Sequence, residues 1–381
     1  MRCVSRSAGH VATEATAVSD TAVGPSAAAR TTTPMRAREI GLEIGSRQPG
    51  SRNAITDVDG VRVGMTTLVA GANVRTGVTV IVPPPEPLIA GCHRLNGNGE
   101  LTGLEWIRES GMLTTAIGIT NTFSVGVVRD AIAMASPEPL DVWALPVVGE
   151  TWDGVLNDIR GQHVTASHVQ TAFRAATGGP VPEGNVGGGT GMICHGFKGG
   201  TGTASRSVEI DGERFCVGVL VQANHGTRRR LVIEGARVGE LIPAEVVPTP
   251  GTPAAPGTGS IIGIVATDAP LLPGQCDALA QRAALGVGRL GGAGEISSGD
   301  LFLCFSTGNR GLVGEAPLAR LRMVRLDLVN ELLYAVIDAT EEAIVNALLA
   351  AETLTGAGGR TAHALGADRL ADALRPFGLL R

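Results

Sequence analysis

Short runs of Val and Ile, bounded by Gly and Pro, recur along the chain from about residue 54. Such runs are typical of β-strands, and they lie at residues 60–68, 76–84 and 113–121. Other segments have apolar positions near a spacing of 3.6, which predicts helices. These segments are 99–111, 124–135 and 165–177, the last with Thr165 as its expected N-cap.

The second half of the chain mixes strands and helices without strict alternation. Residues 206–210 and 214–224 flank a short polar turn and predict a hairpin. Further strands are predicted at 260–268, 300–307 and 321–328, and helices at 272–290 and 330–356, the last as one helix or as two that divide near Asp338. This order favours an α+β or layered α/β sandwich over a doubly wound sheet.

The composition narrows the class of protein. The chain has 381 residues, of which 54 are glycine, and aromatic residues make up 3%. We expect tight turns and closely packed layers of small residues. The net charge is −5 and there is no basic run, so nucleic acid is not expected as a partner. No apolar run approaches the ~20 residues that span a bilayer, so no membrane segment is predicted.

The first residues and the cysteines suggest where the protein works. Residues 1–37 are rich in Ala, Thr and Ser and lack a hydrophobic signal core, so they predict a disordered extension, with Met35 as an alternative start to Met1. The six cysteines are scattered and form no CxxC. This pattern argues against a zinc ribbon and a disulfide scaffold, and it favours a reducing, cytoplasmic location.

Familiar binding and catalytic motifs are missing from the sequence. The glycine-rich segment 184–206 contains neither a P-loop nor a dinucleotide fingerprint, so we expect it to form tight turns. The seven histidines include no HExxH and no close pair beyond His163 and His168. No metal and no cofactor are therefore predicted. A GxSxG nucleophile elbow is absent as well.

A linker of Pro, Gly, Ala and Thr at residues 248–259 runs directly into Ser260 and an apolar strand. One interpretation is a plain connection in which Ser260 merely opens the strand. The other is that the chain is cut between Gly259 and Ser260. Glycine there would let the serine hydroxyl approach the carbonyl behind it for an N→O acyl shift. The new α-amino group, with an ordinary pKa of about 8, would then serve as the base for its own hydroxyl.

Nine segments, in this order, resemble one known family. They are NAITDVDGVRVG, TGVTVIVP, NGNGELTGLEWIRESG, GITNTFSVG, PVVGETWDG, GNVGGGTGM, VQANHG, GSIIGIVATDAPL and SSGDLFLCFSTGN. Over residues 38–378 the chain is similar to the self-processing L-aminopeptidase/D-Ala-esterase/amidases of the DmpA type, which include the β-peptidyl aminopeptidases. The resemblance implies a four-layer αββα sandwich of the N-terminal-nucleophile hydrolase kind. It also implies an α chain of residues 38–259, a β chain of residues 260–381, and a homotetramer of these αβ heterodimers.

The resemblance also assigns roles to residues. Ser260 takes the place of the nucleophile, and Ser298 and Asp300 match the serine and acidic residue that orient its amine and hydroxyl. Asn224 matches the side-chain amide of the oxyanion hole, and Glu150 matches the carboxylate that receives the free amino group of the substrate. The implied reaction releases N-terminal amino acids from small peptides, amides and esters through an acyl-enzyme on Ser260.

Trp152 departs from the family pattern, because the best-known members have a tyrosine there. An indole N–H donates a hydrogen bond but cannot accept one. Two alternatives remain beside the aminopeptidase. One is an acyl transferase like the ornithine/glutamate acetyltransferases, in which the nucleophile is usually Thr. The other is an unprocessed binding protein with a decayed site. The sequence predicts no preference among L-α, D-α and β-amino acid N-termini.

Overall fold

Two β-sheets carry the fold, and they lie face to face. The structure is a computed structural model that describes residues 35–135, 145–251, 259–314 and 316–381. These residues belong to one unit of the chain, residues 34–381. The predicted linker falls largely on residues 252–258, and residues 1–34 make up most of the predicted extension; both stretches lie outside the described residues.

The larger sheet has the strand order β4-β3-β12-β11-β10-β9, and only β11 and β12 run parallel. Its strands are β3 (Leu88–Arg94), β4 (Met112–Leu113), β9 (Gly200–Ile210), β10 (Glu213–Asn224), β11 (Ser260–Thr267) and β12 (Asp300–Ser306). The smaller sheet has the order β1-β2-β5-β6, with a parallel β5–β6 pair. It consists of β1 (Arg62–Ala70), β2 (Val74–Val82), β5 (Ile117–Asn121) and β6 (Val147–Thr151). Two short ladders join β7 (Ile193–Cys194) with β8 (Phe197–Lys198) and β13 (Leu354–Thr355) with β14 (Thr361–Ala362).

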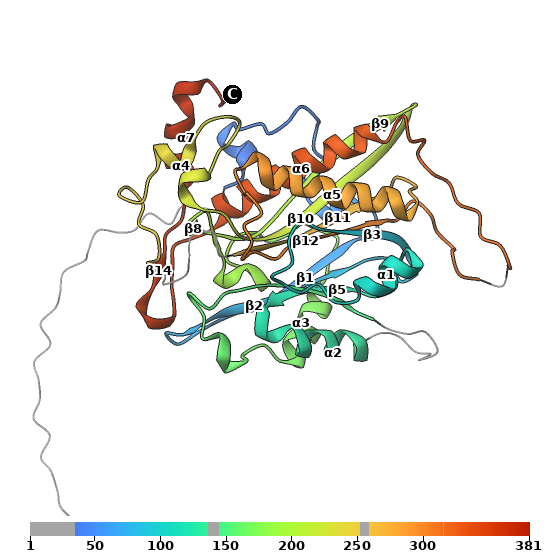
Figure 1. Ribbon diagram of the computed structural model, residues 1–381, viewed down its shortest axis with the longest axis horizontal. Helices are drawn as coiled ribbons and strands as arrows, with labels where there is room; N and C mark the ends of the chain where they lie inside the picture. Colours follow the sequence, from blue (N-terminus) through green and yellow to red (C-terminus); the bar gives the residue numbers. More distant parts are fainter. Residues whose placement is uncertain (1–34, 136–144, 252–258, 315) are drawn as a thin grey trace, which may run out of the picture. The chain divides into compact units, whose positions relative to one another are not determined.

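Helices cover the outer face of each sheet, which gives four layers (Figure 1). Helices α5 (Pro273–Arg289) and α6 (Asn330–Ala350) lie on the six-stranded sheet, and α2 (Val125–Ala135) and α3 (Ala166–Ala175) lie on the four-stranded sheet. The shorter helices are α1 (Leu104–Ser110), α4 (Val238–Leu241) and α7 (Ala367–Leu374). Short 3₁₀ helices occur at Ala37–Ile40, Ile55–Asp57, Thr122–Ser124, Ile159–Gly161, Gly187–Gly191, Arg228–Arg230, Ala357–Gly359 and Arg375–Phe377. The four-layer αββα sandwich is confirmed.

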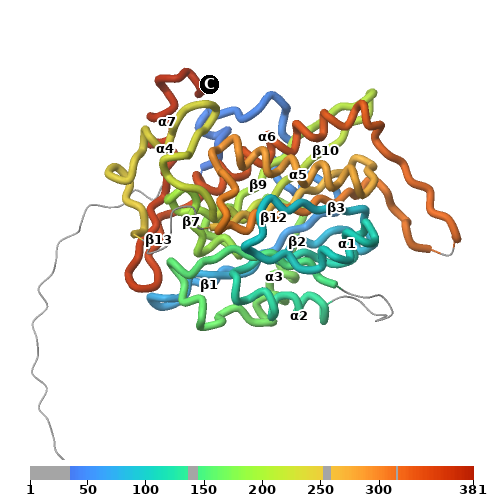
Figure 2. The backbone as a smooth tube through the Cα atoms, viewed as in Figure 1, coloured from blue at the N-terminus to red at the C-terminus, as the bar shows by residue number. Residues whose placement is uncertain are grey.

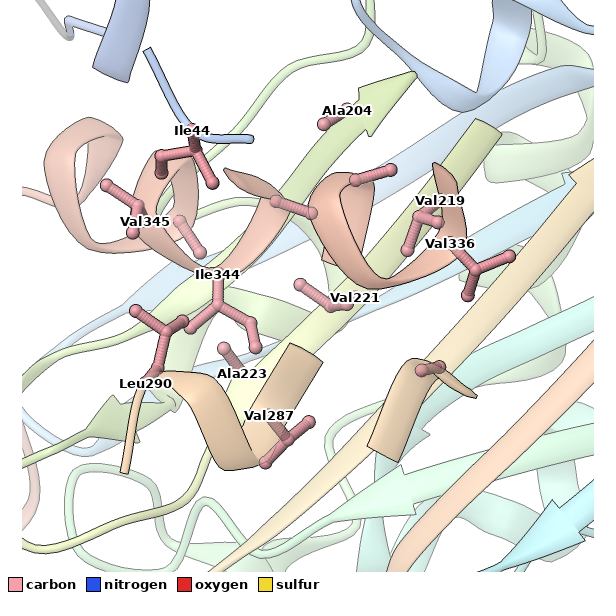
Figure 3. Packing of buried hydrophobic residues seen from close by; sticks show 14 of the residues in the cluster. Ile44, Ala204, Val219, Val221, Ala223, Val287, Leu290, Val336, Ile344 and Val345 are labelled. Atoms are coloured by element: carbon pink, nitrogen blue, oxygen red, sulfur yellow. The ribbon is translucent and has the colours of Figure 1, made fainter. Parts of the chain in front are cut away.

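The layers follow from the alternation of side chains along buried strands. On β11, Ile262 and Ile264 pack between the two sheets, whereas Ile261 and Val265 pack under the helices. Figure 3 shows the helical side of this core, with Ile344 of α6 packed over Val221 of β10. Complete burial of one such aliphatic side chain contributes about 1.5–3 kcal/mol, so both faces of the central sheet are strongly stabilised.

The two ends of the described fold lie together (Figure 2). Leu42 pairs with Leu380 in an isolated bridge, and the Arg381 N–H donates to the Gly41 carbonyl at 2.9 Å. The fold starts earlier than the predicted boundary at residue 37. Arg36 donates to the carbonyls of Asn53 and Thr203, both at 2.7 Å, and the side chain of Ala37 is fully buried.

Most of the predicted elements are confirmed within a few residues, including the hairpin of β9 and β10. The strand predicted at 321–328 is wrong: the segment alternates, but Met323 and Leu326 are exposed and face no sheet. Of the residues predicted as helix at 330–356, Leu354–Thr355 belong to β13 instead, and residues 330–350 form one continuous helix without a break at Asp338. There the Asp338 carboxylate pairs with Arg289 at 3.0 Å. Strands β3 and β6 were not predicted. Among the described residues, no helix is long and apolar enough to cross a membrane.

Candidate active site

Three neighbouring strands of the large sheet bring the predicted site residues together. Ser260 opens β11, and its register partner on β10 is Asn224, the last residue of that strand. On the other side, Ile261 is paired with Asp300, the first residue of β12. Residues far apart in the sequence therefore meet where these three strands begin or end. Ser260, Asn224 and Asp300 are all buried there.

The Ser260 hydroxyl lies against residues 298–300, which lead into β12. The Gly299 N–H donates to Ser260 Oγ at 3.0 Å. Ser298, also buried, donates its hydroxyl to Asp300 Oδ1. Gly299 has no space for a side chain, since a Cβ there would lie 2.6 Å from Gly99 Cα. The sequence SSGD thus supplies a main-chain N–H that donates to Ser260 Oγ and a serine hydroxyl that donates to the Asp300 carboxylate.

The Asp300 carboxylate is held by several donors at once. Oδ1 accepts the Ile261 N–H at 3.2 Å in addition to the Ser298 hydroxyl, and Oδ2 accepts Asn96 Nδ2 at 3.2 Å. Burial raises the pKa of Asp300 above its ordinary value, and the hydrogen bonds from Ser298 and Asn96 oppose that rise. The group is therefore a desolvated acid whose ionisation depends on its donors.

The Asn224 side chain has a fixed orientation. Its Oδ1 accepts the Ile193 N–H at 2.8 Å, and its Nδ2 donates to the Trp152 carbonyl at 3.1 Å. An amide nitrogen carries two hydrogens, so one N–H remains for another acceptor beside Ser260. Trp152 contributes here through its main-chain carbonyl, and the residue as a whole is 41% exposed.

Glu150 comes from the smaller sheet, on β6. The neighbouring Gly149 faces β11 across the sheet interface, because a Cβ there would lie 2.9 Å from the Ile262 side chain. Glu150 is 3% exposed; it accepts the Glu100 N–H at 3.1 Å and the Thr122 hydroxyl. Burial raises its pKa above the ordinary value. Such a carboxylate gains most from an added cation, because burying it unpaired is costly.

The loop 96–100 joins these two halves of the site. A Cβ on Gly99 would lie 3.0 Å from Gly299 Cα and 3.1 Å from Glu150 Oε1, so the loop fits between them. Sequence reasoning gave no role to Asn96, Glu100 or Thr122. The two Asn-Gly pairs in NGNGE signal a turn, but nothing local in the sequence shows what the turn contacts.

A cavity of about 440 Å³ opens beside this loop. It shares Gly99 with the surroundings of Glu150, and Leu301 of β12 also lines it. The remaining wall includes Arg94, Arg108 and Trp106. The site therefore borders a space large enough for a small substrate group.

One cluster among the described residues has the composition of a metal site. Ligand atoms of Cys194, His195 and His225, all buried, lie within 4.8 Å of one another. The local charge opposes a cation, however. The Arg228 guanidinium donates to the His195 carbonyl at 3.0 Å, and the buried Lys198 pairs with Ile193 next to Cys194. We assign no metal role to this cluster.

Comparisons with known proteins agree with this geometry. The family model described as Peptidase family S58 matches residues 53–362. A β-peptidyl aminopeptidase, BapA of Sphingosinicella microcystinivorans, is 48% identical over 87% of this chain and 89% of its own length. The structure of a Burkholderia sp. β-aminopeptidase is 52% identical, with a TM-score of 0.85 over 90% of this chain and 99% of that one. The L-aminopeptidase D-Ala-esterase/amidase of Ochrobactrum anthropi, described as a variant of the Ntn hydrolase fold, is 41% identical, with a TM-score of 0.82 over 92% and 100%.

Proposed function

Because the chain belongs to peptidase family S58 and is a self-processing serine aminopeptidase that releases N-terminal residues, we propose that Ser260 is its nucleophile and that cleavage between Gly259 and Ser260 exposes it. The observation that carries this assignment is the environment of Ser260 Oγ. Ser260 is the buried first residue of β11, and its Oγ accepts the Gly299 N–H at 3.0 Å. It lies between the strand ends that bear Asn224 and Asp300.

Cleavage changes the chemistry of the Ser260 nitrogen. In the uncut chain it is a peptide nitrogen and cannot act as a base. Once it is a free amine, with an ordinary pKa of about 8, it accepts the hydroxyl proton as Oγ attacks the substrate carbonyl. The C–N bond of the substrate then breaks, the leaving amine takes the proton, and water hydrolyses the ester on Ser260. Ser298 and Asp300 orient the amine and hydroxyl through their shared hydrogen bond.

The negative charge that develops on the substrate carbonyl oxygen needs donors. Asn224 supplies its second amide N–H, since its Oδ1 is fixed by Ile193 and its first N–H by the Trp152 carbonyl. A fixed donor of this kind stabilises the transition state without reorganisation. This role fits the register pairing of Asn224 with the nucleophile.

In this proposal Glu150 makes the enzyme select substrates that have a free N-terminal amino group. Its carboxylate is buried and holds only neutral donors, Thr122 and the Glu100 N–H, among the described residues. A substrate ammonium would pair with it and offset the cost of burial. A carboxylate at a fixed distance from the nucleophile would thus set the length of the residue released.

The preferred substrates, in our proposal, are short peptides with an N-terminal β-amino acid. Two relatives at 48% and 52% identity bear the names β-peptidyl aminopeptidase and β-aminopeptidase. The family match favours a peptidase over the acetyltransferase-like alternative. A homotetramer of αβ heterodimers and a cytoplasmic location remain predictions from the family resemblance and the cysteine pattern.

The decisive test is the Ser260→Ala variant. Wild-type protein should run as two fragments on a denaturing gel, and the smaller one should begin Ser-Ile-Ile-Gly. The variant should stay one band and release no p-nitroaniline from β-homo-Ala, L-Ala or D-Ala p-nitroanilide. Ser167→Ala, an exposed serine on α3, is the matched control and should behave as wild type. A processed and active Ser260→Ala protein would refute the assignment, and an uncut, inactive wild type would support the unprocessed binding protein.

A further inference from the structure

We propose that Asn96 is a positioning residue for the reaction: it clamps Asp300 across the cleavage boundary and so aims the carboxylate at Ser298 beside the nucleophile. The inference rests on the proposed function of Ser260. Asn96 lies in the predicted α chain, whereas Asp300, Ser298 and Ser260 lie in the predicted β chain. The contact therefore joins the two fragments at the catalytic centre.

The clamp has two opposed hydrogen bonds. Asn96 Oδ1 accepts the main-chain N–H of Asp300 at 2.6 Å, and Asn96 Nδ2 donates to Asp300 Oδ2 at 3.2 Å. The same Nδ2 donates its other hydrogen to the Glu295 carbonyl at 3.0 Å. Every polar atom of the Asn96 side chain is thus bonded to the segment 295–300. With Oδ2 held in this way, Oδ1 of Asp300 faces Ser298 and the Ile261 N–H.

Main-chain bonds fix the loop that carries Asn96. The Leu95 N–H donates to the Asp300 carbonyl at 3.0 Å, and the Asn98 N–H donates to the Ser298 carbonyl at 3.1 Å. Two residues further along, the Glu100 N–H reaches Glu150. One short loop therefore sets the positions of both the carboxylate that orients the nucleophile and the carboxylate that binds the substrate amine.

The clamp also controls the charge of Asp300. A donor on Oδ2 favours the ionised form, because the carboxylate accepts the hydrogen bonds from Ser298 and Asn96 more strongly than the protonated acid does. The charged residues on the elements that pack around Asp300 are Arg94 on β3, Glu100 in the loop, Glu295 on the same segment and Glu150 on β6. In the described part of the chain none of them hydrogen-bonds the Asp300 carboxylate. After cleavage, the Ser260 amine adds a cation beside Ile261, so wild type and variants must be compared in the processed form.

The test compares Asn96→Ala, Asn96→Asp and the neighbouring Asn98→Ala. Asn98 is the matched control, because its side chain donates to the Ser297 carbonyl and not to Asp300. For processed Asn96→Ala we expect kcat on β-homo-Ala p-nitroanilide to fall about 10- to 100-fold, the range for a lost hydrogen bond to a charged group, with KM changed less than about 3-fold. We also expect the acid limb of its pH profile, the range in which kcat falls as the pH is lowered, to move to higher pH. Asn96→Asp, which puts a second carboxylate against Asp300, should move that limb further, and Asn98→Ala should leave it in place.

Two further readouts keep the outcomes distinct. If Asn96→Ala is processed only slowly, the rate of self-cleavage of the purified precursor, measured against pH, should show the same displaced limb. If it stays uncut, or does not fold by thermal melt, Asn96→Ser is used in its place. A variant with wild-type kcat and acid limb would overturn the positioning role, as would a loss of activity that matches the loss of folded protein. Ser260→Ala, run alongside, separates this outcome from a failure of the proposed function.

Discussion

The main-chain oxygen of Asn224 occupies the position where a side chain on Gly259 would begin. A Cβ atom on Gly259 would lie 2.1 Å from that oxygen, and Gly259 has a φ of +150°. The next residue, Ser260, pairs with Asn224 in the β10–β11 ladder. The proposed cleavage site is therefore held tightly against the strand that carries the proposed oxyanion donor, and only glycine fits before the serine.

Gly259→Ala should slow or abolish self-cleavage. The added methyl group forces the chain before Ser260 away from Asn224, and a non-glycine residue at this φ is strained by about 1–3 kcal/mol. The measurement is the fraction of uncut precursor against time on a denaturing gel, with a thermal melt. Gly274→Ala in α5, where a Cβ meets nothing within 4 Å, is the control and should be cut normally. Wild-type cleavage of Gly259→Ala would contradict the packing argument.

Glu150→Gln should weaken the binding of substrates with a free amino group. The neutral amide keeps the shape of the side chain but loses the charge that pairs with the ammonium, so KM should rise about 10- to 100-fold, with a smaller change in kcat. Glu109→Gln is the control, because Glu109 is an exposed glutamate on α1 that makes no contact with Glu150 among the described residues. Equal KM values for Glu150→Gln and wild type would remove Glu150 from the amine site.

The pH dependence of kcat/KM should carry the signature of Glu150. Burial raises the pKa of this carboxyl, so it takes up a proton at a higher pH than an ordinary Glu and then no longer attracts an ammonium. As pH falls, kcat/KM should therefore drop earlier than an exposed Glu would predict. In Glu150→Gln the contribution of Glu150 to this acid limb should be lost, whereas the contributions of Asp300 and of the Ser260 amine should remain. If the limb persists unchanged there, another group titrates.

Asn224→Ala should lower kcat about 10²- to 10³-fold, the usual cost of one lost oxyanion donor. Trp152→Tyr should change kcat far less, because Trp152 meets Asn224 through its carbonyl, which the substitution retains. Both variants should be assayed in processed form against the same p-nitroanilides. A fall for Trp152→Tyr as large as that for Asn224→Ala would mean that the indole itself takes part in the chemistry.

How far the sequence predicts the site depends on the range of the contacts involved. The linker followed by an apolar strand pointed to Ser260, and the family segments pointed to Asn224, Ser298 and Asp300, which three adjacent strands then bring together. Asn96 could not be found in this way, because it acts on a residue 204 positions later. Its role depends on the pairing of β3 with β12, and β3 itself was not predicted.

The errors have the same physical origin. Alternation at 321–328 favoured a strand, yet a strand forms only where a neighbour accepts its main-chain bonds. Among the described residues, the main-chain hydrogen bond that joins this segment to a distant part of the chain runs from the Val324 N–H to the Pro270 carbonyl. In α6 the acidic residue that suggested a break is held instead by ion pairs from other segments, Arg289 at 3.0 Å and Arg47 at 3.7 Å. In both segments, contacts with distant parts of the chain, and not the local sequence pattern, determine the secondary structure.

Asp153→Asn should stabilise the protein at alkaline pH and much less at acid pH. Asp153 is fully buried; Oδ1 accepts Asn157 Nδ2 at 3.1 Å, and the side chains of Thr76 and Asn121 also lie against the carboxylate. Burial raises its pKa to about 7, and these side chains oppose the rise. Between the unfolded pKa near 4 and that value, the folded protein holds a proton that the unfolded chain has lost. The contribution of Asp153 to stability therefore falls as pH rises from about 4 to about 7 and levels off above that. The amide cannot ionise, so this loss disappears in the variant.

The measurement is the difference in unfolding free energy between Asp153→Asn and wild type, at pH 5 and at pH 8. We expect a stabilisation on the order of 2–4 kcal/mol at pH 8 and little difference at pH 5. Burial also raises the pKa values of Glu183 and Glu341 to about 7, but both groups are present in the two proteins and cancel in the difference. Asp130→Asn, with 75% of its side chain exposed on α2, is the control and should show no such pH dependence. An equal difference at the two pH values would mean that Asp153 stays ionised in the fold.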